Sequence, residues 1–480
     1  MTGVLRFIRH TLVTPRGVFF LLFFGTALFV LHARSETPFG NYLVYQPGEQ
    51  VGAVMHFVLL PLLVIGLAVL IQTPPARFRS VSLRLVLCGA TALALLWWLI
   101  PPLISRDVYY SFYYGQAITE GVNPYSVTIG DRFVAPFAAL TDPIFFNLPT
   151  PYGPIWQGVS SMVVRLAALQ PLVGVLLLRL LVLPVFLVVV WCIGSLAERR
   201  WGGGAYAAAL FGWNPLALLY FFNEAHNDIF LLLGFALAAV FLDRRRYLYA
   251  GLALIVGGLF KWVPLLLLPL VAAAARSERP FRSTRRLGVI LAGLAVLAVV
   301  VGFLPFWDGA NPLAGILKQT GLLNLTFFLA QGAFFLGSAD HSTLTFGSGS
   351  IGISGLGLTV VKAFGFLLFI GLSAHLLLRV IRQKISWSEA GYLQVFLFLV
   401  FSISWFMPWY VFWLVPFAAL HPAYLRLTAI ITAGFLGAFF FPPHIALLFF
   451  LVFVAALSLF WRIREVAGET LRRRSGQQHV

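Results

Sequence analysis

Long apolar stretches separated by short polar connections dominate the pattern of this chain of 480 residues. Most stretches approach or reach the roughly 20 residues with which a helix spans the hydrocarbon of a membrane. Because a lipid-exposed backbone must satisfy its own hydrogen bonds, the pattern predicts helices. The apolar stretches are residues 17–33, 52–71, 84–104, 172–195, 204–222, 229–242, 287–306, 355–381, 388–405, 425–441 and 446–462.

Two further segments do not fit one simple span each. Residues 154–170 are long enough for a short span, but a crossing there would reverse the rest of the chain, so a helix along the membrane surface is predicted. Residues 247–279 must begin and end on the same side, which predicts two short helices broken at "FKWVP", residues 260–264. Broken helices are tolerated at membrane depth where they line a cavity, and the break places Lys261 near the surface.

The composition supports a membrane protein and excludes a set of soluble domains, since 60% of the residues are hydrophobic and only 10% are charged. The prediction is therefore an all-α polytopic membrane protein of about 13 transmembrane helices, forming a single domain over residues 1–480. The first stretch follows a basic start but lacks a small-residue cleavage site, so we expect it to be retained.

The net charge of +17 reports the orientation of the chain. Basic residues concentrate in alternate connections, which predicts that both termini are cytoplasmic and explains the charge by attraction to anionic lipid instead of nucleic acid. These connections hold 25 of the 33 basic residues, within residues 6–16, 77–84, 199–200, 244–246, 276–286, 379–384, 426 and 462–474.

The opposite connections are expected on the outer side, and the largest are residues 105–171, the first large outer loop, and 307–354, the late outer loop. Ten of the sixteen acidic residues fall in the outer connections taken together, so any chemistry is predicted to face outward. They are Glu36, Glu49, Asp107, Glu120, Asp131, Asp142, Glu224, Asp228, Asp308 and Asp340.

Asp107 begins the first large outer loop, in the segment "SRDVYYSFYYGQ" at residues 105–116. One interpretation is a solvated helix end neutralised by Arg106. The other follows from the four tyrosines at 109, 110, 113 and 114, since aromatic rings with hydroxyl groups pack against sugars and lipid head groups. We favour the second interpretation, with Asp107 as a functional carboxylate.

A second polar cluster, "NEAHND" at residues 223–228, opens the apolar stretch 229–242. Helix geometry places Glu224 and Asp228 on one face. Helix capping needs only one such residue, so the cluster exceeds that need, and ionisable residues near membrane depth are functional candidates. A histidine beside two carboxylates also suits a metal ion, but no ligand geometry supports one, and no metal or cofactor is predicted.

Several cations and aromatic residues lie within apolar sequence. Arg165 is explained by its side chain reaching the interface, whereas Lys261 and Arg179 lie deeper and imply an anionic partner, either Asp228 or Glu224 or a ligand phosphate. Tyr152 could wall a site. The segment "WFMPWYVFW", residues 405–413, is interpreted first as an interfacial aromatic belt.

In this order along the chain, the motifs resemble the polytopic GT-C glycosyltransferases, and most of all the polyprenyl-phosphate-mannose-dependent mannosyltransferases. The motifs are "DVYY" at residue 107, "EGVNPY" at 120, "YGPIW" at 152, "HND" at 226 and "KWVP" at 261, and they span about residues 84–275. The resemblance implies a GT-C-like helix bundle whose large outer loop carries surface helices.

The resemblance also implies transfer of a sugar from a polyprenyl phosphate to an acceptor hydroxyl on the non-cytoplasmic face, usually with inversion. An aspartate in the first large outer loop serves as the general base in that family, and the matching residue is Asp107. Two extra spans precede Asp107 here, where many members have one in all, so the sugar stays open. The substrate-binding candidates are Arg106, Tyr110, Tyr152, Arg179, Glu224, His226, Asn227, Asp228 and Lys261.

Two other functions remain open from the sequence. A transporter or flippase of lipid-linked glycans would also use intramembrane cations and broken helices, but it predicts an inverted repeat, and none is recognisable. A glycan ligase or polymerase would instead take its donor from a lipid pyrophosphate. The partners expected in the leading hypothesis are the polyprenyl-phosphate donor, a glycan or glycolipid acceptor and membrane lipid.

Overall fold

The computed structural model describes residues 14–35, 58–309, 311, 313–319, 322–323, 351–352, 356–403, 406–438 and 455. Three predictions fall largely outside these residues: the last apolar span, most of the late outer loop and the basic C-terminal tail.

The described residues are almost entirely helical, which confirms the all-α class. The exception is a two-residue antiparallel pairing of β1 (Leu322–Leu323) with β2 (Ile351–Gly352). The first half of the chain forms α2 (Pro15–Ser35), α4 (Leu60–Gln72), η3 (Pro75–Phe78), α5 (Leu83–Trp97), α6 (Asp107–Thr119), α7 (Phe137–Leu140), η4 (Pro143–Phe145), α8 (Pro154–Leu166), α9 (Pro171–Trp201), α10 (Gly204–Gly212), α11 (Pro215–Ala217) and η5 (Leu218–Asn223).

The second half of the chain consists of further, mostly apolar helices. Its elements are α12 (Asp228–Asp243), α13 (Tyr247–Phe260), η6 (Val263–Leu267), α14 (Leu268–Glu278), α15 (Phe281–Phe303), η7 (Leu304–Phe306), α16 (Ala314–Gln319), α18 (Leu356–Ile381), α19 (Trp387–Phe401), η8 (Pro408–Leu414), α20 (Val415–Ala418) and α21 (Pro422–Ala438).

Four of the described helices are long and apolar enough to cross a membrane, or five if α10 and the α11–η5 pair, bent by 49°, form one span. The four are the helical segments Pro15–Ala33, Pro171–Trp201, Phe281–Phe306 and Lys362–Ile381. Other apolar helices are shorter, so helix length alone does not establish the predicted total of about 13 spans. The membrane character of the chain is nevertheless supported by these apolar helices.

The structure confirms the predicted break at "FKWVP" and corrects another boundary. Helix α13 ends at Phe260, the chain turns through η6, and α14 begins at Leu268. By contrast, residues 406–424 are not among the predicted apolar stretches, yet η8 starts at Pro408 and continues into α20 up to Ala418. This segment was missed because its prolines and the following "HP" divide the apolar run.

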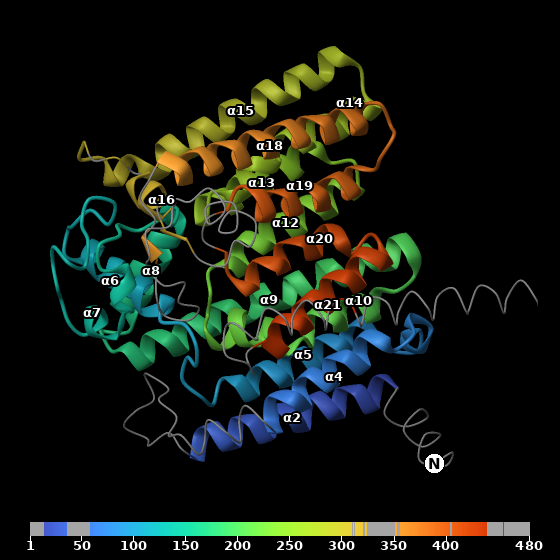
Figure 1. Cartoon of the computed structure of the whole chain (residues 1–480), viewed down its shortest axis with the longest axis horizontal. Coiled ribbons are helices and arrows are strands. Elements are labelled where there is room, and N and C mark those ends of the chain that lie inside the picture. The colour runs from blue at the N-terminus through green and yellow to red at the C-terminus, as the bar shows by residue number, and fades with distance from the viewer. Residues whose placement is uncertain are drawn as a thin grey trace, which may run out of the picture.

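Most helices lie roughly along one direction, and the layer formed by α6, α7 and α8 covers one end of the bundle (Figure 1). Close backbone approaches fix this layer. A Cβ atom at Gly115 of α6 would lie 2.6 Å from the Ser160 carbonyl oxygen of α8, and one at Gly153 would lie 2.1 Å from the carbonyl oxygen of Leu259 in α13. A helix is therefore observed within the predicted segment 154–170, as α8, which ends at Leu166 and is joined tightly to α6 and to the end of α13.

Candidate active site

Asp107 is the first residue of α6. Its backbone N–H donates to Ser105 Oγ at 3.1 Å, and its side chain is 17% exposed. Burial raises the pKa of this carboxyl from 3.8 to about 6, although the Ser105 side chain and the positive charge of Lys261 act in the opposite direction. Asp107 is thus a partly desolvated carboxylate that can exchange a proton near neutral pH.

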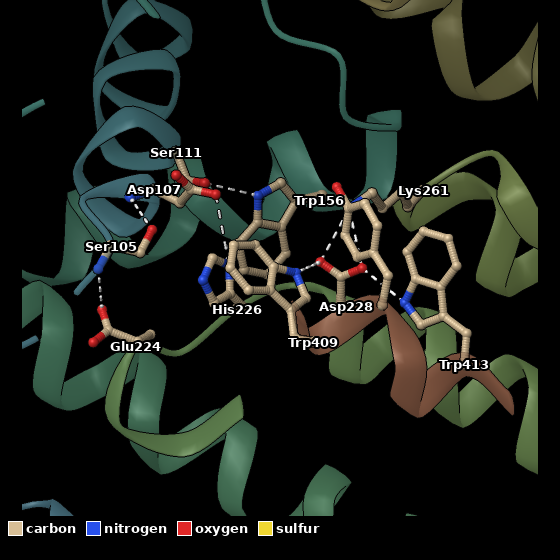
Figure 2. Close-up of polar contacts among 11 residues, drawn as sticks. Ser105, Asp107, Ser111, Trp156, Glu224, His226, Asp228, Lys261, Trp409 and Trp413 are labelled. Atoms are coloured by element: carbon tan, nitrogen blue, oxygen red, sulfur yellow. Dashed lines mark hydrogen bonds and ion pairs between the residues drawn. The ribbon is translucent and has the colours of Figure 1, made fainter. Parts of the chain in front are cut away.

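The residues before Asp107 are held by the start of the second polar cluster. Glu224 Oε1 accepts hydrogen bonds from the backbone N–H groups of Leu103 and Ile104 at 2.7 and 2.8 Å, and Oε2 accepts from Ser105 at 3.1 Å. Burial raises the pKa of Glu224 to about 7, and the three backbone donors oppose that rise. Figure 2 shows the chain of contacts from Glu224 through Ser105 to Asp107.

Asn223 and Arg179 hold the same stretch further back. Asn223 Nδ2 donates to the carbonyl oxygens of Trp97, Ile100 and Pro101 at 3.1–3.3 Å. Arg179 is fully buried, and its guanidinium donates to the carbonyl oxygens of Asn223, Trp98 and Ile100. The interactions resolved for the Arg179 guanidinium are therefore largely with backbone carbonyls of the neighbouring connections.

Asp228, the first residue of α12, forms a buried ion pair with Lys261, which lies in the break between α13 and α14. Lys261 Nζ lies 3.0 Å from both carboxylate oxygens, and the side chains of Lys261 and Asp228 are 12% and 1% exposed. Two indole N–H groups also donate hydrogen bonds to the Asp228 carboxylate, from Trp409 at 3.3 Å and from Trp413 at 3.0 Å. The sequence predicted that Lys261 has an anionic partner, and the structure shows that Asp228 is this partner. A buried charge pair also needs the additional hydrogen bonds that the indoles supply.

His226 bridges the ion pair and Asp107. Its Nδ1 lies 3.6 Å from Asp107 Oδ2, and its ring stacks on Trp409 with centroids 4.1 Å apart. Burial, assisted by the nearby Lys261, lowers the pKa of His226 to about 3, so the imidazole is neutral at physiological pH. The preceding Ala225 has φ of 50°, a left-handed conformation that costs a non-glycine residue about 1–3 kcal/mol and is found at functional sites.

One small cavity joins these groups. Its volume is about 10 Å³, which is room for about one water molecule. It is lined by Asp107, Tyr110, Phe145, Leu148, Pro151, Tyr152, Lys261, Trp409 and Tyr410. A carboxylate and an ammonium therefore face the same space, between aromatic walls.

The remaining predicted residues are distributed around this centre. Tyr110 and Tyr152 line the cavity, and the Tyr110 hydroxyl donates to the carbonyl oxygens of Leu148 and Pro149. Arg106 is half-buried beside Asp107, and its guanidinium forms no hydrogen bond or ion pair with the described residues. Asn227 is buried next to His226.

The structure corrects the interpretation of two aromatic segments. The four tyrosines of α6 do not form a free face for ligands, because all are buried to 2% exposure or less and only Tyr110 reaches the cavity. Trp409, Tyr410 and Trp413 do not form an interfacial belt, because they are buried around Asp228 and Lys261. The sequence signal for this role is the run of tryptophan and tyrosine residues after Pro408, because their N–H and O–H groups can donate hydrogen bonds to a buried carboxylate.

Comparison with known proteins identifies the family. The family profile described as "alpha-(1->6)-mannopyranosyltransferase, N-terminal domain" matches residues 17–277, which include Asp107, the 223–228 cluster and Lys261. The chain belongs to this family. The resemblance to membrane mannosyltransferases is thereby confirmed.

Curated members of the alpha-(1->6)-mannopyranosyltransferase family are distant relatives. Alpha-(1->6)-mannopyranosyltransferase A of Mycobacterium tuberculosis is 28% identical over 350 residues, which cover 67% of this chain and 63% of that protein. A second alpha-(1->6)-mannopyranosyltransferase of the same organism is 26% identical over 76% of this chain and 75% of its own length. A probable enzyme of this type in Mycolicibacterium smegmatis is 25% identical over 72% of each chain. No solved structure matches the chain.

Among the described residues, no group of three or more His, Cys, Asp or Glu side chains is arranged to hold a metal ion. The groups that gather are instead one carboxylate near its pKa, a lysine, a neutral imidazole and aromatic rings.

Proposed function

We propose that this protein transfers a mannosyl group from a polyprenyl-phosphate donor to an acceptor hydroxyl of a glycan or glycolipid, with inversion at the anomeric carbon. The family name suggests that the acceptor is the 6-hydroxyl of a mannosyl residue. The observation that carries the proposal is the shared cavity, because Asp107 and Lys261 supply a base and a cation to one space.

The reaction needs both groups at once. The acceptor oxygen attacks the anomeric carbon and forms a new C–O bond, while the C–O bond to the donor phosphate breaks and its electron pair leaves with the polyprenyl phosphate. The proton of the acceptor hydroxyl passes to the Asp107 carboxylate. Inversion follows because nucleophile and leaving group occupy opposite faces of the sugar ring.

Asp107 suits the role of general base because its pKa of about 6 lies close to the operating pH. At neutral pH most of this carboxyl is ionised and able to accept a proton, yet it is a stronger base than an exposed aspartate. His226, 3.6 Å away, can donate an N–H to Asp107 and fix its orientation when the site tightens around substrate.

Lys261 suits stabilisation of the departing phosphate. Its ammonium gains charge-assisted hydrogen bonds to a phosphate oxygen, and Asp228 holds it in place from the opposite side. The phosphate is already a good leaving group, so a cation is more useful than a general acid. Arg106, half-buried and next to Asp107, is the second cation within reach of an anionic donor.

Sugar recognition is assigned to polar atoms that have no other use. His226 Nε2 and Asn227 Nδ2 are buried and have no hydrogen-bond partner among the described residues. Such atoms are costly unless a ligand satisfies them, and sugar hydroxyls are suitable partners. The cavity is too small for a sugar as it stands, so entry of the donor requires aromatic wall residues such as Tyr152 and Tyr410 to move.

The proposed orientation places the site on the non-cytoplasmic face of the cell membrane. The basic connections at residues 199–200, 244–246 and 276–286 lie at the end of the bundle opposite α6, as expected if they are cytoplasmic. A lipid-borne sugar would then meet its acceptor at the α6–α8 layer, with its polyprenyl tail in the membrane.

The test is transfer of radiolabelled mannose from synthetic polyprenyl-phosphate mannose to membrane acceptors by the purified full-length protein. We expect Asp107→Asn to lower kcat by about 10²–10⁴-fold, the range typical of general base catalysis. Donor binding should survive, because the amide keeps the shape of the side chain.

Three outcomes would overturn the proposal. If Asp107→Asn retains full activity, the base is another group. If the intact protein transfers no sugar from this donor or from its arabinose and glucose counterparts, yet moves labelled lipid between leaflets, the protein is a transporter. Transfer only from a lipid-pyrophosphate glycan would instead assign a ligase or polymerase.

A further inference from the structure

We propose that Glu224 is a positioning residue that holds the polypeptide immediately before Asp107, and not a ligand of the substrate. This inference rests on the proposed role of Asp107. It assigns the precision of the catalytic carboxylate to a second carboxylate 117 positions later in the sequence.

The contacts of Glu224 define the role. Both of its carboxylate oxygens are occupied by three successive backbone N–H groups, those of Leu103, Ile104 and Ser105, at 2.7, 2.8 and 3.1 Å. A carboxylate that accepts three charge-assisted hydrogen bonds has little remaining capacity for a sugar hydroxyl.

The held segment has no regular structure of its own. Helix α5 ends at Trp97 and α6 begins at Asp107, so residues 98–106 have no continuous backbone ladder to fix them. Buried backbone N–H groups require partners, and Glu224 supplies them for three consecutive residues. The contact to Ser105 then passes directly to the site, because Ser105 Oγ accepts the backbone N–H of Asp107.

Glu224 is itself fixed by its neighbours, as a positioning residue must be. It is 1% exposed and follows the π-helical turn η5, which ends at Asn223. Asn223 donates to three carbonyl oxygens of residues 97–101, and Arg179 donates to the Asn223 carbonyl oxygen. Asn223 thus binds carbonyl oxygens in the first part of the connection, and Glu224 binds N–H groups in its last part.

The expected consequence is specific to the chemical step. A shift of about 1 Å in a catalytic group can cost roughly 100-fold in rate without loss of substrate binding. Glu224→Gln keeps the size of the side chain but replaces one acceptor oxygen with an N–H₂ donor, which would oppose one of the backbone donors. We therefore expect kcat to fall by about 10–100-fold, while KM for the polyprenyl-phosphate donor stays within about 3-fold.

The experiment compares Glu224→Gln with Glu198→Gln in the full-length protein. Glu198 is a control for the chemistry of the substitution, because its carboxylate also accepts a backbone N–H, that of Gly204 at 2.8 Å, but on an exposed residue of α9. Hydrogen exchange of the peptide spanning residues 98–106 is measured by mass spectrometry, beside kcat and KM for mannose transfer. We expect faster exchange and lower kcat in Glu224→Gln alone.

The readouts separate the possible failures. A raised KM with unchanged hydrogen exchange would make Glu224 a substrate ligand and overturn the inference. Faster hydrogen exchange with unchanged kcat would also overturn it, because the held segment would then not control the chemical step. If Asp107→Asn stays active, the proposed function fails, and the exchange data still report on the held segment. If Glu224→Gln does not fold, Ser105→Ala replaces it, since it removes only the contact to the Asp107 N–H, and an unchanged kcat in that variant also overturns the inference.

Discussion

The two ends of α12 carry the same kind of interaction in different surroundings. Asp228, the first residue of the helix, is paired with Lys261 inside the bundle, where the lysine side chain is 12% exposed. Asp243, the last residue, is itself only 5% exposed but is paired at 2.8 and 2.6 Å with Arg199 and Arg200, whose side chains are 54% and 46% exposed.

The difference lies in solvent access and in redundancy. Exposed ion pairs contribute little, because water and salt screen the charges, and Asp243 keeps one arginine if the other is lost. Asp228 has a single cation, two indole donors and almost no water around it. A charge pair maintained at such a site implies a use for the charge, which we assign to the donor phosphate.

Lys261→Met breaks the comparison most severely. It leaves the Asp228 carboxylate buried without its cation, so we expect the free energy of unfolding to fall by about 3–5 kcal/mol. We also expect kcat to fall by about 10²–10³-fold, as for loss of one group that stabilises transition-state charge. Thermal unfolding in detergent and mannose transfer measure the two effects.

A second substitution separates stability from catalysis. In Lys261→Met with Asp228→Asn, no unpaired charge remains and the amide oxygen can still accept from an indole N–H. Most of the lost stability should therefore return, whereas activity should not. Recovery of activity in the double variant would mean that Lys261 serves only to neutralise Asp228.

The sequence predicted the fold where local signals agree with the tertiary structure. The apolar runs predict helices, and "FKWVP" predicts the break after Phe260, because a proline and a charged residue interrupt an apolar run. Helix η8 was missed because its prolines resemble those of a connection. The count of spans depends on how short helices sit in the bundle, which periodicity does not reveal.

The site was predicted as a set of polar residues but not as an arrangement. Asp107, His226 and Lys261 stand out because polar groups are unusual in apolar sequence. The division of labour between Glu224 and Asp228 could not be predicted, since each is an acidic residue of one short cluster. Only the structure shows that one binds backbone N–H groups and the other a lysine.

The pH dependence sharpens the contrast between buried and exposed carboxyls. Because burial raises the pKa of Asp107 to about 6, its basic form is lost on acidification well above the usual 3.8. We therefore expect kcat/KM to be level only above about pH 8 and to fall on acidification, first through the pKa of Glu224 near 7 and then through that of Asp107 near 6. Mannose transfer measured from pH 5 to 8 in one ionic strength checks this limb.

Desolvation is the cause assigned to this shift, so added solvent should reverse it. Tyr152→Ala opens the cavity beside Asp107, and the acidic limb should then move to lower pH even if the rate also falls. A limb that stays near pH 6 in this variant would assign the titration to another group.

Arg199→Ala at the far end of α12 should have the smallest effect. Its guanidinium is 54% exposed, and Arg200 still pairs with Asp243 after the change, so we expect less than about 1 kcal/mol of destabilisation and unchanged kcat and KM. The same unfolding and transfer assays used for Lys261→Met apply. A loss of several kcal/mol would show that ion pairs at the basic end are as important to the fold as the pair at the site, and burial would no longer explain why the two ends of α12 differ.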